Sequence, residues 1–338
     1  MKQALKILCL IFLLSLVSCS SVSSLYYDVP PELNSLEKLS AFIEVYSPYI
    51  KNKMIFIDPG HGGEDRKNRG YQGLAIEADV NLSVSLELKK LFILAGAVVQ
   101  MSRELDETVP LKLRSEMANK SGADIFISIH HNAPPLEGDD YTNYTSTYFH
   151  SLAENYNYEP CERDIAKFIQ RDLAYAMRNS GGPGSFDGTY SDYSVYPGDG
   201  FSVLRLTEIP AVLVECGFHT HKIQEQKLAD EFFNKIEAWG IFKGLCRYFK
   251  AGIPEIKFRS RSENDSTVTE TFFISDSSGI DINSIKVYTD SVKSEFGYDT
   301  LTNVLSVDLK KEKKYSELRI IAANKNGNHS FPFTRKLY

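Results

Sequence analysis

The chain has 338 residues, of which 43% are hydrophobic and 24% are charged, and its formal net charge at pH 7 is -6. This composition is typical of a globular protein and lacks the excess of basic residues that binding to nucleic acid requires, so we expect no nucleic acid among its partners. The length exceeds that of a typical domain, which predicts a core domain with an appended module.

The first residues have the layout of a secretory signal. Lys2 and Lys6 flank the start of an uncharged apolar run over residues 7–17, which is too short to span a bilayer as a stable helix. Residues 16–19 read Leu-Val-Ser-Cys and resemble the bacterial lipobox, so we expect cleavage before Cys19 and lipidation of that cysteine. The alternative is a plain cleaved signal with a chance cysteine. The lipobox predicts an exported protein, anchored to a membrane through Cys19 and facing the periplasm or the wall.

Three cysteines remain for the exported part of the chain, namely Cys161, Cys216 and Cys246. They are too few for a disulfide framework and lack the CxxC spacing of many metal sites. One disulfide with one thiol left over is possible, and the sequence does not choose between the pairings.

The segment after the signal, residues 20–50, predicts a tether. It begins with small polar residues and continues through Pro30 and Pro31 to a short helical pattern over residues 33–46.

From residue 54 onward, short apolar runs alternate with longer helical patterns. We expect strands at 54–57, 97–101, 124–129 and 211–214, and helices at 79–95, 111–120, 161–179 and 226–249. Residues 79–95 also alternate like a strand, but a run of this length without a turn signal before Gly96 favours a helix. The alternation predicts an α/β domain over 51–250, with a mostly parallel sheet covered by helices on both faces. Residues 181–200 are rich in Gly, Ser, Tyr and Asp, which indicates a mobile loop.

A change of pattern follows residues 251–254. Short alternating segments separated by turn residues occur at 255–258, 269–274, 284–289, 304–309 and 318–323. This pattern predicts a small all-β sandwich over residues 254–338, and the turns at 276–280 and 324–328 resemble those of bacterial Ig-like domains. We expect such a module to act as a spacer or as an attachment domain.

Two histidines follow predicted strands. Residues 58–63 read Asp-Pro-Gly-His-Gly-Gly, which forces a sharp turn and presents His61 at the sheet edge where open α/β sheets bind ligands. A turn histidine without a partner is the simpler interpretation of one such residue. However, the strand at 124–129 also ends in a histidine, His130, so two imidazoles reach the same edge. The adjacent His131 points elsewhere by alternation and is interpreted as a wall residue.

Two imidazoles and one carboxylate form a usual catalytic zinc site, in which water takes the fourth position. Glu77 is the best candidate for the carboxylate, because it precedes the helix that begins at the same edge of the sheet. Its alternative role is to favour the helix N-terminus through the dipole, and Asp79 suits the N-cap better.

Glu215 follows the apolar strand at 211–214. A carboxylate there is costly to bury without a partner, so it could instead emerge into solvent where the strand ends. Beside a metal-bound water it could take the proton of the water and pass it to a departing nitrogen.

Five blocks in order along residues 53–250 resemble the zinc-dependent N-acetylmuramoyl-L-alanine amidases of the type 3 class. The blocks lie at residues 58–63, 73–82, 113–119, 123–130 and 203–218. The resemblance implies that His61, Glu77 and His130 bind one zinc ion and that Glu215 is the catalytic carboxylate. It further implies hydrolysis of the peptidoglycan amide between the lactyl group of muramic acid and L-alanine, for wall remodelling or daughter-cell separation.

The chain departs from this family pattern at two places. Ala78 stands where a lysine is frequent, and residues 219–221 read His-Thr-His where Ser-Asn or Thr-Asn is common, which leaves the groove beyond Glu215 undefined. His219 and His221 could bind a second metal, although the proposed chemistry requires only one.

Some sequence features remain without a firm role. His150 and His329 have no supporting context. Residues 134–160 and 181–200 lie between the third ligand and Glu215 and could gate the site.

Two alternative functions share these features. One is a zinc peptidase that cuts within the stem peptide, and the other is a non-catalytic peptidoglycan-binding lipoprotein. The presence of all four metal and acid/base residues argues against the second. A partner protein that activates the enzyme is compatible with the sequence.

Overall fold

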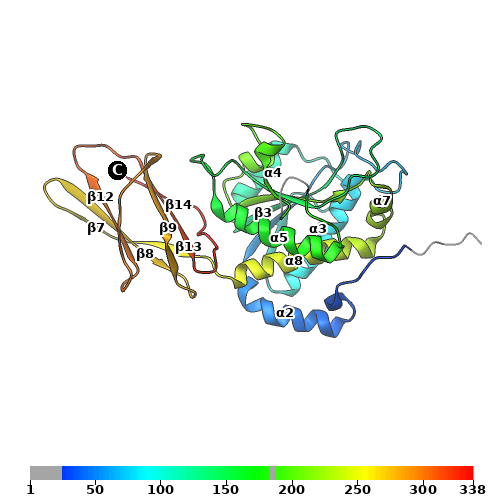
Figure 1. Cartoon of the computed structure of the whole chain (residues 1–338), viewed down its shortest axis with the longest axis horizontal. Helices are drawn as coiled ribbons and strands as arrows, with labels where there is room; N and C mark the ends of the chain where they lie inside the picture. Colours follow the sequence, from blue (N-terminus) through cyan, green and yellow to red (C-terminus); the bar gives the residue numbers. More distant parts are fainter. Residues whose placement is uncertain (1–24, 183–186, 338) are drawn as a thin grey trace, which may run out of the picture.

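A computed structural model describes residues 25–182 and 187–337, which form an α/β domain followed by an all-β domain (Figure 1). The predicted signal at residues 1–19, with the predicted lipidation site Cys19, lies outside the described residues. Within the two described ranges, none of the helices combines the length and the hydropathy that crossing a bilayer requires.

The central sheet has six strands among the described residues, in the order β2-β1-β3-β6-β4-β5. Their bounds are β1 Met54–Pro59, β2 Val98–Met101, β3 Ile125–Asn132, β4 Ser146–Phe149, β5 Thr189–Ser191 and β6 Ala211–Phe218. β1 runs parallel to β2 and β3, and β3 runs parallel to β6, whereas β4 is antiparallel to β6. The predicted mostly parallel sheet is therefore confirmed.

The sequence predicted β1, β2, β3 and β6 and missed β4 and β5, which are neighbours at one end of the sheet. β1, β3 and β6 are predominantly apolar runs because the sheet is covered on both faces. β5 lies inside residues 181–200, which were predicted to form a loop, and Thr189 pairs with Thr147 of β4. A three-residue edge strand is too short to show periodicity.

Helices cover both faces of the sheet, as predicted (Figure 1). Their bounds are α2 Leu36–Ile50, α3 Glu77–Leu94, α4 Leu111–Ser121, α5 Pro160–Met177, α6 Ser202–Arg205, α7 Lys222–Leu228 and α8 Glu231–Lys250, with short 3-10 turns η1 Pro31–Leu33 and η2 Asp192–Ser194. The larger core contains side chains from α3, α5 and α8, including Leu88, Ile165 and Trp239. The smaller core, on the other face, joins α4 and α6 to the sheet through Ala118 and Val203.

Three helix predictions differ from the structure. The N-cap of α3 is Ile76, so Asp79 is not the cap and instead pairs with Arg66 at 2.5 Å. The single helix predicted at 226–249 is two helices, because Asp230 interrupts the chain and caps α8 by accepting a hydrogen bond from the N–H of residue 232. The helical pattern predicted over residues 33–46 within the tether is present as α2 with shifted bounds, and this helix packs on α8.

Residues 255–337 form two four-stranded antiparallel sheets, ordered β10-β9-β13-β14 and β11-β12-β8-β7. Their strands are β7 Glu255–Glu263, β8 Thr267–Ser275, β9 Ile280–Thr289, β10 Val292–Lys293, β11 Gly297–Asp299, β12 Val304–Lys310, β13 Glu317–Asn324 and β14 Phe333–Lys336. Alternating buried side chains such as Phe272, Leu305 and Ile320 fill the space between the sheets. The predicted all-β sandwich is confirmed.

The two domains pack against each other through buried polar contacts. Arg319 of β13 is 4% exposed, forms an ion pair with Glu159 at 2.8 Å and donates a hydrogen bond to the carbonyl of Tyr158. The amides of Asn324 and Asn328 donate to backbone carbonyls at the C-terminal end of α8. The sandwich is thereby fixed to the end of this helix.

Candidate metal centre

The sharp turn after β1 places His61 beside His130. Gly60 donates its backbone N–H to the carbonyl of Ile129 at 2.9 Å, and His61 follows in the left-handed region at φ 58°. A Cβ atom on Gly60 would lie 2.2 Å from the ring of His130, so only glycine leaves room for that ring. The two imidazole centroids are consequently 5.0 Å apart.

A buried ion pair between Asp58 and Arg114 stabilises this turn. Asp58 is 1% exposed, and its carboxylate accepts hydrogen bonds from Arg114 at 2.7 Å and Ser128 at 2.8 Å. The same guanidinium donates to the carbonyls of Pro59 and His61. Sequence reasoning gave Arg114 no role, although the residue falls in one of the family-like blocks.

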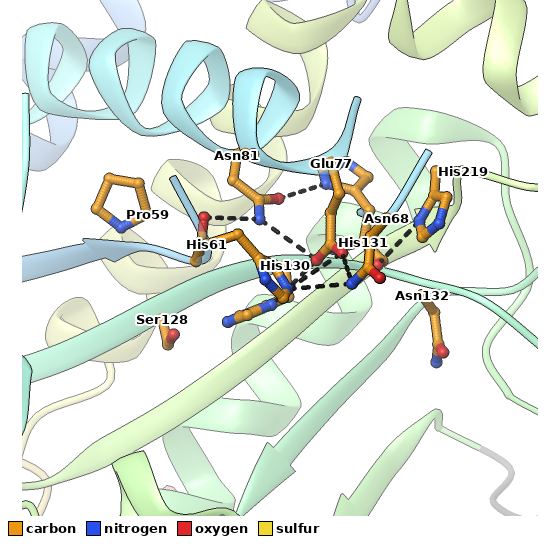
Figure 2. Close-up of polar contacts among 12 residues, drawn as sticks. Pro59, His61, Asn68, Glu77, Asn81, Ser128, His130, His131, Asn132 and His219 are labelled. Atoms are coloured by element: carbon orange, nitrogen blue, oxygen red, sulfur yellow. Dashed lines mark hydrogen bonds and ion pairs between the residues drawn. The ribbon is translucent and has the colours of Figure 1, made fainter. Parts of the chain in front are cut away.

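Glu77 lies between the two imidazoles (Figure 2). Its Oε2 is 3.1 Å from Nε2 of His61, and its Oε1 is 3.1 Å from Nδ1 of His130. The ligand atoms of the three side chains all lie within 4.8 Å of one another. The structure thus brings together the three residues predicted to bind zinc, and their role as ligands stays a prediction.

Several neighbours fix the positions of these side chains. Asn68 donates to Oε2 of Glu77 at 2.7 Å, and the backbone N–H of His131 donates to Oε1 at 3.1 Å. Asp65 lies 2.8 Å from Nδ1 of His61, on the side of the ring away from Glu77. A carboxylate on the outer nitrogen of a histidine is the usual way to orient a metal ligand.

Charge is concentrated in this cluster. Burial alone would raise the pKa of Glu77, but the hydrogen bonds and charges of His130 and His61 hold it well below its usual range. Burial alone would lower the pKa of His61, but Glu77 and Asp65 raise it to about 9. The protein without metal therefore holds a proton where a divalent cation would supply the positive charge. Two imidazoles and one carboxylate are also the donor set that catalytic zinc prefers, so the residues fit that ion.

Glu215 lies beside this cluster, because its position on β6 pairs with His130 on β3. β6 continues past the predicted end at residue 214, so Glu215 does not emerge from the end of a strand. Its Oε2 is buried and has no hydrogen-bond partner among the residues that the structure describes. Burial, together with the charge of Glu77, raises the pKa of Glu215 well above its usual range. A buried carboxyl oxygen without a hydrogen-bond partner is costly, which points to a functional role.

An open hollow of about 780 Å³ gives access to these residues. Its lining includes His61, Glu77, His130 and Glu215. The lining also includes residues 196–197, 199–203 and 205, so part of the segment 181–200 borders the site. None of the described lining residues comes from 134–160, the other segment predicted to gate it.

The histidines beyond Glu215 have separate positions. His219 lines the hollow, and its Nδ1 is 3.2 Å from the carbonyl of His131. His221 caps α7, accepting a hydrogen bond from the N–H of Gln224 at 3.1 Å. Neither belongs to a group of three or more possible metal ligands among the described residues.

His131 also touches the hollow, but its ring is buried between Asn81 and Glu237. Glu237 and Asn81 come from α8 and α3, and sequence reasoning gave neither a role. Cys216 lies close enough to complete a second group of possible ligand atoms with His131 and Glu237.

The remaining histidines and cysteines have ordinary structural surroundings. His150 pairs with Asp192 at 2.8 Å, and His329 pairs with Asp164 at 2.7 Å. The sequence could not show these partners because they lie far away along the chain. The cysteines left open by the sequence are all free and buried; they are Cys161, Cys216 and Cys246.

A family model described as N-acetylmuramoyl-L-alanine amidase matches residues 55–247, a range that contains His61, Glu77, His130 and Glu215. The germination-specific N-acetylmuramoyl-L-alanine amidase of Bacillus subtilis (strain 168) is 28% identical over 214 residues, covering 59% of this chain and 81% of that protein. The uncharacterized protein YqiI of the same strain is 33% identical over 200 residues, covering 59% and 86%.

Solved structures give a similar result. The N-acetylmuramoyl-L-alanine amidase from Clostridium difficile 630 has a TM-score of 0.51 at 29% identity, covering 59% of this chain and 98% of that one. The CwlD amidase from Clostridioides difficile, in complex with the GerS lipoprotein, has a TM-score of 0.50 at 27% identity, covering 59% and 99%.

Proposed function

The chain belongs to the N-acetylmuramoyl-L-alanine amidase family, and from this we propose that it is a zinc-dependent amidase acting on peptidoglycan. The bond cut would be the amide between N-acetylmuramic acid and L-alanine. The observation that carries the proposal is the convergence of His61, Glu77 and His130 beside the unpartnered carboxyl group of Glu215, all lining one open hollow.

His61, Glu77 and His130 would hold the zinc ion. When bound, the ion supplies a Lewis acid that lowers the pKa of water and polarises the amide carbonyl. The protein residues prepare this site before any ion binds. Asp65 orients the ring of His61, and Asn68 holds one oxygen of Glu77.

Glu215 would move the proton. Because no described residue bonds to its Oε2, that oxygen is available to accept a proton from the attacking water. The same group would then donate the proton to the nitrogen of L-alanine as the amide bond breaks.

Export and attachment complete the proposal. Residues 1–19 would be a lipoprotein signal, Cys19 would anchor the protein to a membrane, and residues 51–250 and 254–338 would be the catalytic and Ig-like domains. The role would be wall remodelling or daughter-cell separation. The solved complex of the CwlD amidase with a lipoprotein supports the idea that an activator protein could bind this chain as well.

Incubation of purified peptidoglycan with residues 20–338 tests the function, with and without a chelator and then with added zinc. We expect zinc-dependent release of stem peptides that carry a free L-alanine N-terminus. Cleavage within the stem would instead indicate the zinc peptidase. No release under any metal condition would contradict an enzyme that is active by itself, and would leave either a non-catalytic binding protein or an amidase that requires its activator.

A further inference from the structure

A second hollow lies on the all-β domain, far in the sequence from the metal centre. It has a volume of about 460 Å³ and is bordered by β7, β8, the end of β12 and the turn that follows. Five of its described lining residues are basic and one, Glu263, is acidic. The basic residues are Arg261, Lys310, Lys311, Lys313 and Lys314.

This concentration of positive charge is local. Residues 255–338 contain 13 Lys or Arg and 12 Asp or Glu residues, so the domain as a whole has no large excess of cations. The whole chain is acidic, with a formal net charge of -6. Five cations around one hollow therefore form a positively charged site on a chain whose net charge is negative.

The fold itself does not use most of these cations. Arg261 lies 3.5 Å from Glu270, and Lys311 lies 3.4 Å from Glu263. In the described part of the domain, no ion pair involves Lys310, Lys313 or Lys314. Neighbouring like charges repel one another, and a bound anion would relieve this repulsion.

The location leaves the hollow free for a ligand. The sheet that contains β13 faces the α/β domain, where Arg319 and Asn324 make their contacts. The basic residues belong to the other sheet, whose strands β7 and β12 lie on the far side of the sandwich (Figure 1). Leu309 and Tyr315 add apolar surface to its lining.

We propose that this basic hollow binds the carboxylates of peptidoglycan stem peptides and so gives the chain a second contact with the wall. The choice of polymer rests on the proposed function, because an amidase gains from a second site on its own substrate. Lysine ammonium groups suit such a ligand, since they pair with flexible carboxylates without demanding a fixed geometry. A weak second site raises the effective concentration of substrate at the first.

Co-sedimentation with peptidoglycan stripped of phosphate-containing polymers tests this inference. The background is the full exported chain with Glu215→Gln, so that binding is measured without digestion. The test variant adds Lys310→Glu, Lys313→Glu and Lys314→Glu. The control adds Lys286→Glu, Lys293→Glu and Lys325→Glu, which change the charge equally at exposed positions elsewhere on the same domain.

We expect the test variant to bind stripped peptidoglycan at least about tenfold more weakly than the control, and binding of the parent chain to weaken with added salt. Equal binding of the two variants at equal melting temperatures would overturn the proposal. Loss of all parent binding once the phosphate polymers are removed would overturn it too. Hydrolysis of soluble muropeptides by the chain with Glu215 intact reports on the proposed function separately.

Discussion

Asn81 of α3 and His131 of β3 are joined by a 2.7 Å hydrogen bond directly behind the candidate metal centre (Figure 2). The Asn81 amide nitrogen lies 3.2 Å from the carbonyl of Gly60 and 3.4 Å from Oε1 of Glu77. On its other side, the ring of His131 lies 3.1 Å from Oε1 of Glu237. A chain of buried polar groups thus runs from α8 to the carboxylate between the two imidazoles.

The first prediction concerns this buried chain. Asn81→Leu removes the amide that positions Glu77, and we expect zinc affinity to fall about 10–100-fold while the protein stays folded. Competition with a chromophoric zinc chelator measures the affinity. Ser85→Ala is the control, because Ser85 is buried one turn further along α3 and its hydroxyl has no described partner. Equal affinity in both variants would show that Asn81 does not position the site.

The second prediction separates proton transfer from metal binding. Glu215→Gln keeps the shape of the side chain and removes its ability to accept a proton. We expect amide hydrolysis to fall about 10²–10⁴-fold, with zinc still bound. Counting free L-alanine N-termini released from peptidoglycan, alongside zinc content, provides both readouts. Activity within a few-fold of the native chain would rule out the assigned role.

The third prediction concerns metal removal. A ligand that binds only the folded state raises the melting temperature, so adding zinc to the chelated protein should stabilise it. His61→Ala removes one of the three donors and should abolish most of this gain. Thermal unfolding with and without zinc makes the comparison. A zinc-dependent rise of the same size in the variant would place the ion elsewhere.

The fourth prediction is a dependence of stability on pH. Glu162 of α5 is 5% exposed and accepts a hydrogen bond from the N–H of Ala211 at 3.1 Å. Burial raises its pKa well above the ordinary value of 4.5, and the charges of Glu159 and Asp192 add to this effect. The folded chain therefore keeps a proton that the unfolded chain has released. The contribution of this group to stability falls as pH rises above about 4.5.

Glu162→Gln does not titrate and keeps an acceptor oxygen for one of the two backbone N–H groups that bond to this carboxyl, those of Ala211 and His150. Its free energy of unfolding should therefore rise relative to the native chain as pH increases from 4.5 towards neutrality. Urea unfolding of both proteins across that window gives the difference. A difference that stays constant with pH would mean that Glu162 does not titrate as described.

The fifth prediction tests the contact between the domains. Arg319→Met leaves Glu159 without its partner in a largely buried position, and we expect a loss of about 2–4 kcal/mol of stability. Lys336→Met changes an exposed residue of β14 and should have little effect. Thermal unfolding measures both. Equal melting temperatures for the two variants would show that the Arg319 contacts add little to the interface.

The parts of the fold that sequence could predict are those with strong local patterns. Predominantly apolar runs revealed β1, β3 and β6, because strands buried on both faces need them. Chemically distinctive residues at or near the ends of those runs then indicated the site. This is why His61, His130 and Glu215 could be named before their positions were known.

The rest depended on contacts between distant segments. Asn81 and Glu237 lie on helices whose patterns do not show that their polar side chains face inward, and they meet His131 only after packing. Arg114 reaches Asp58 across 56 positions of the chain. The division between α7 and α8 depends on one residue, Asp230, which caps α8. In the sequence, a capping aspartate looks the same as an exposed aspartate within a helix.

α8 receives a contact from each flank of the α/β domain. At its start, the hydroxyl of Tyr27 donates to Asp230, the N-cap, at 2.6 Å. At its other end, Asn324 and Asn328 of the sandwich donate to the carbonyls of Ala251 and Tyr248. Trimming the protein to residues 51–250 would therefore uncover both tips of its longest helix. Removal of either flank would therefore take hydrogen bonds away from this helix and lower the stability of the stretch that carries the chemistry.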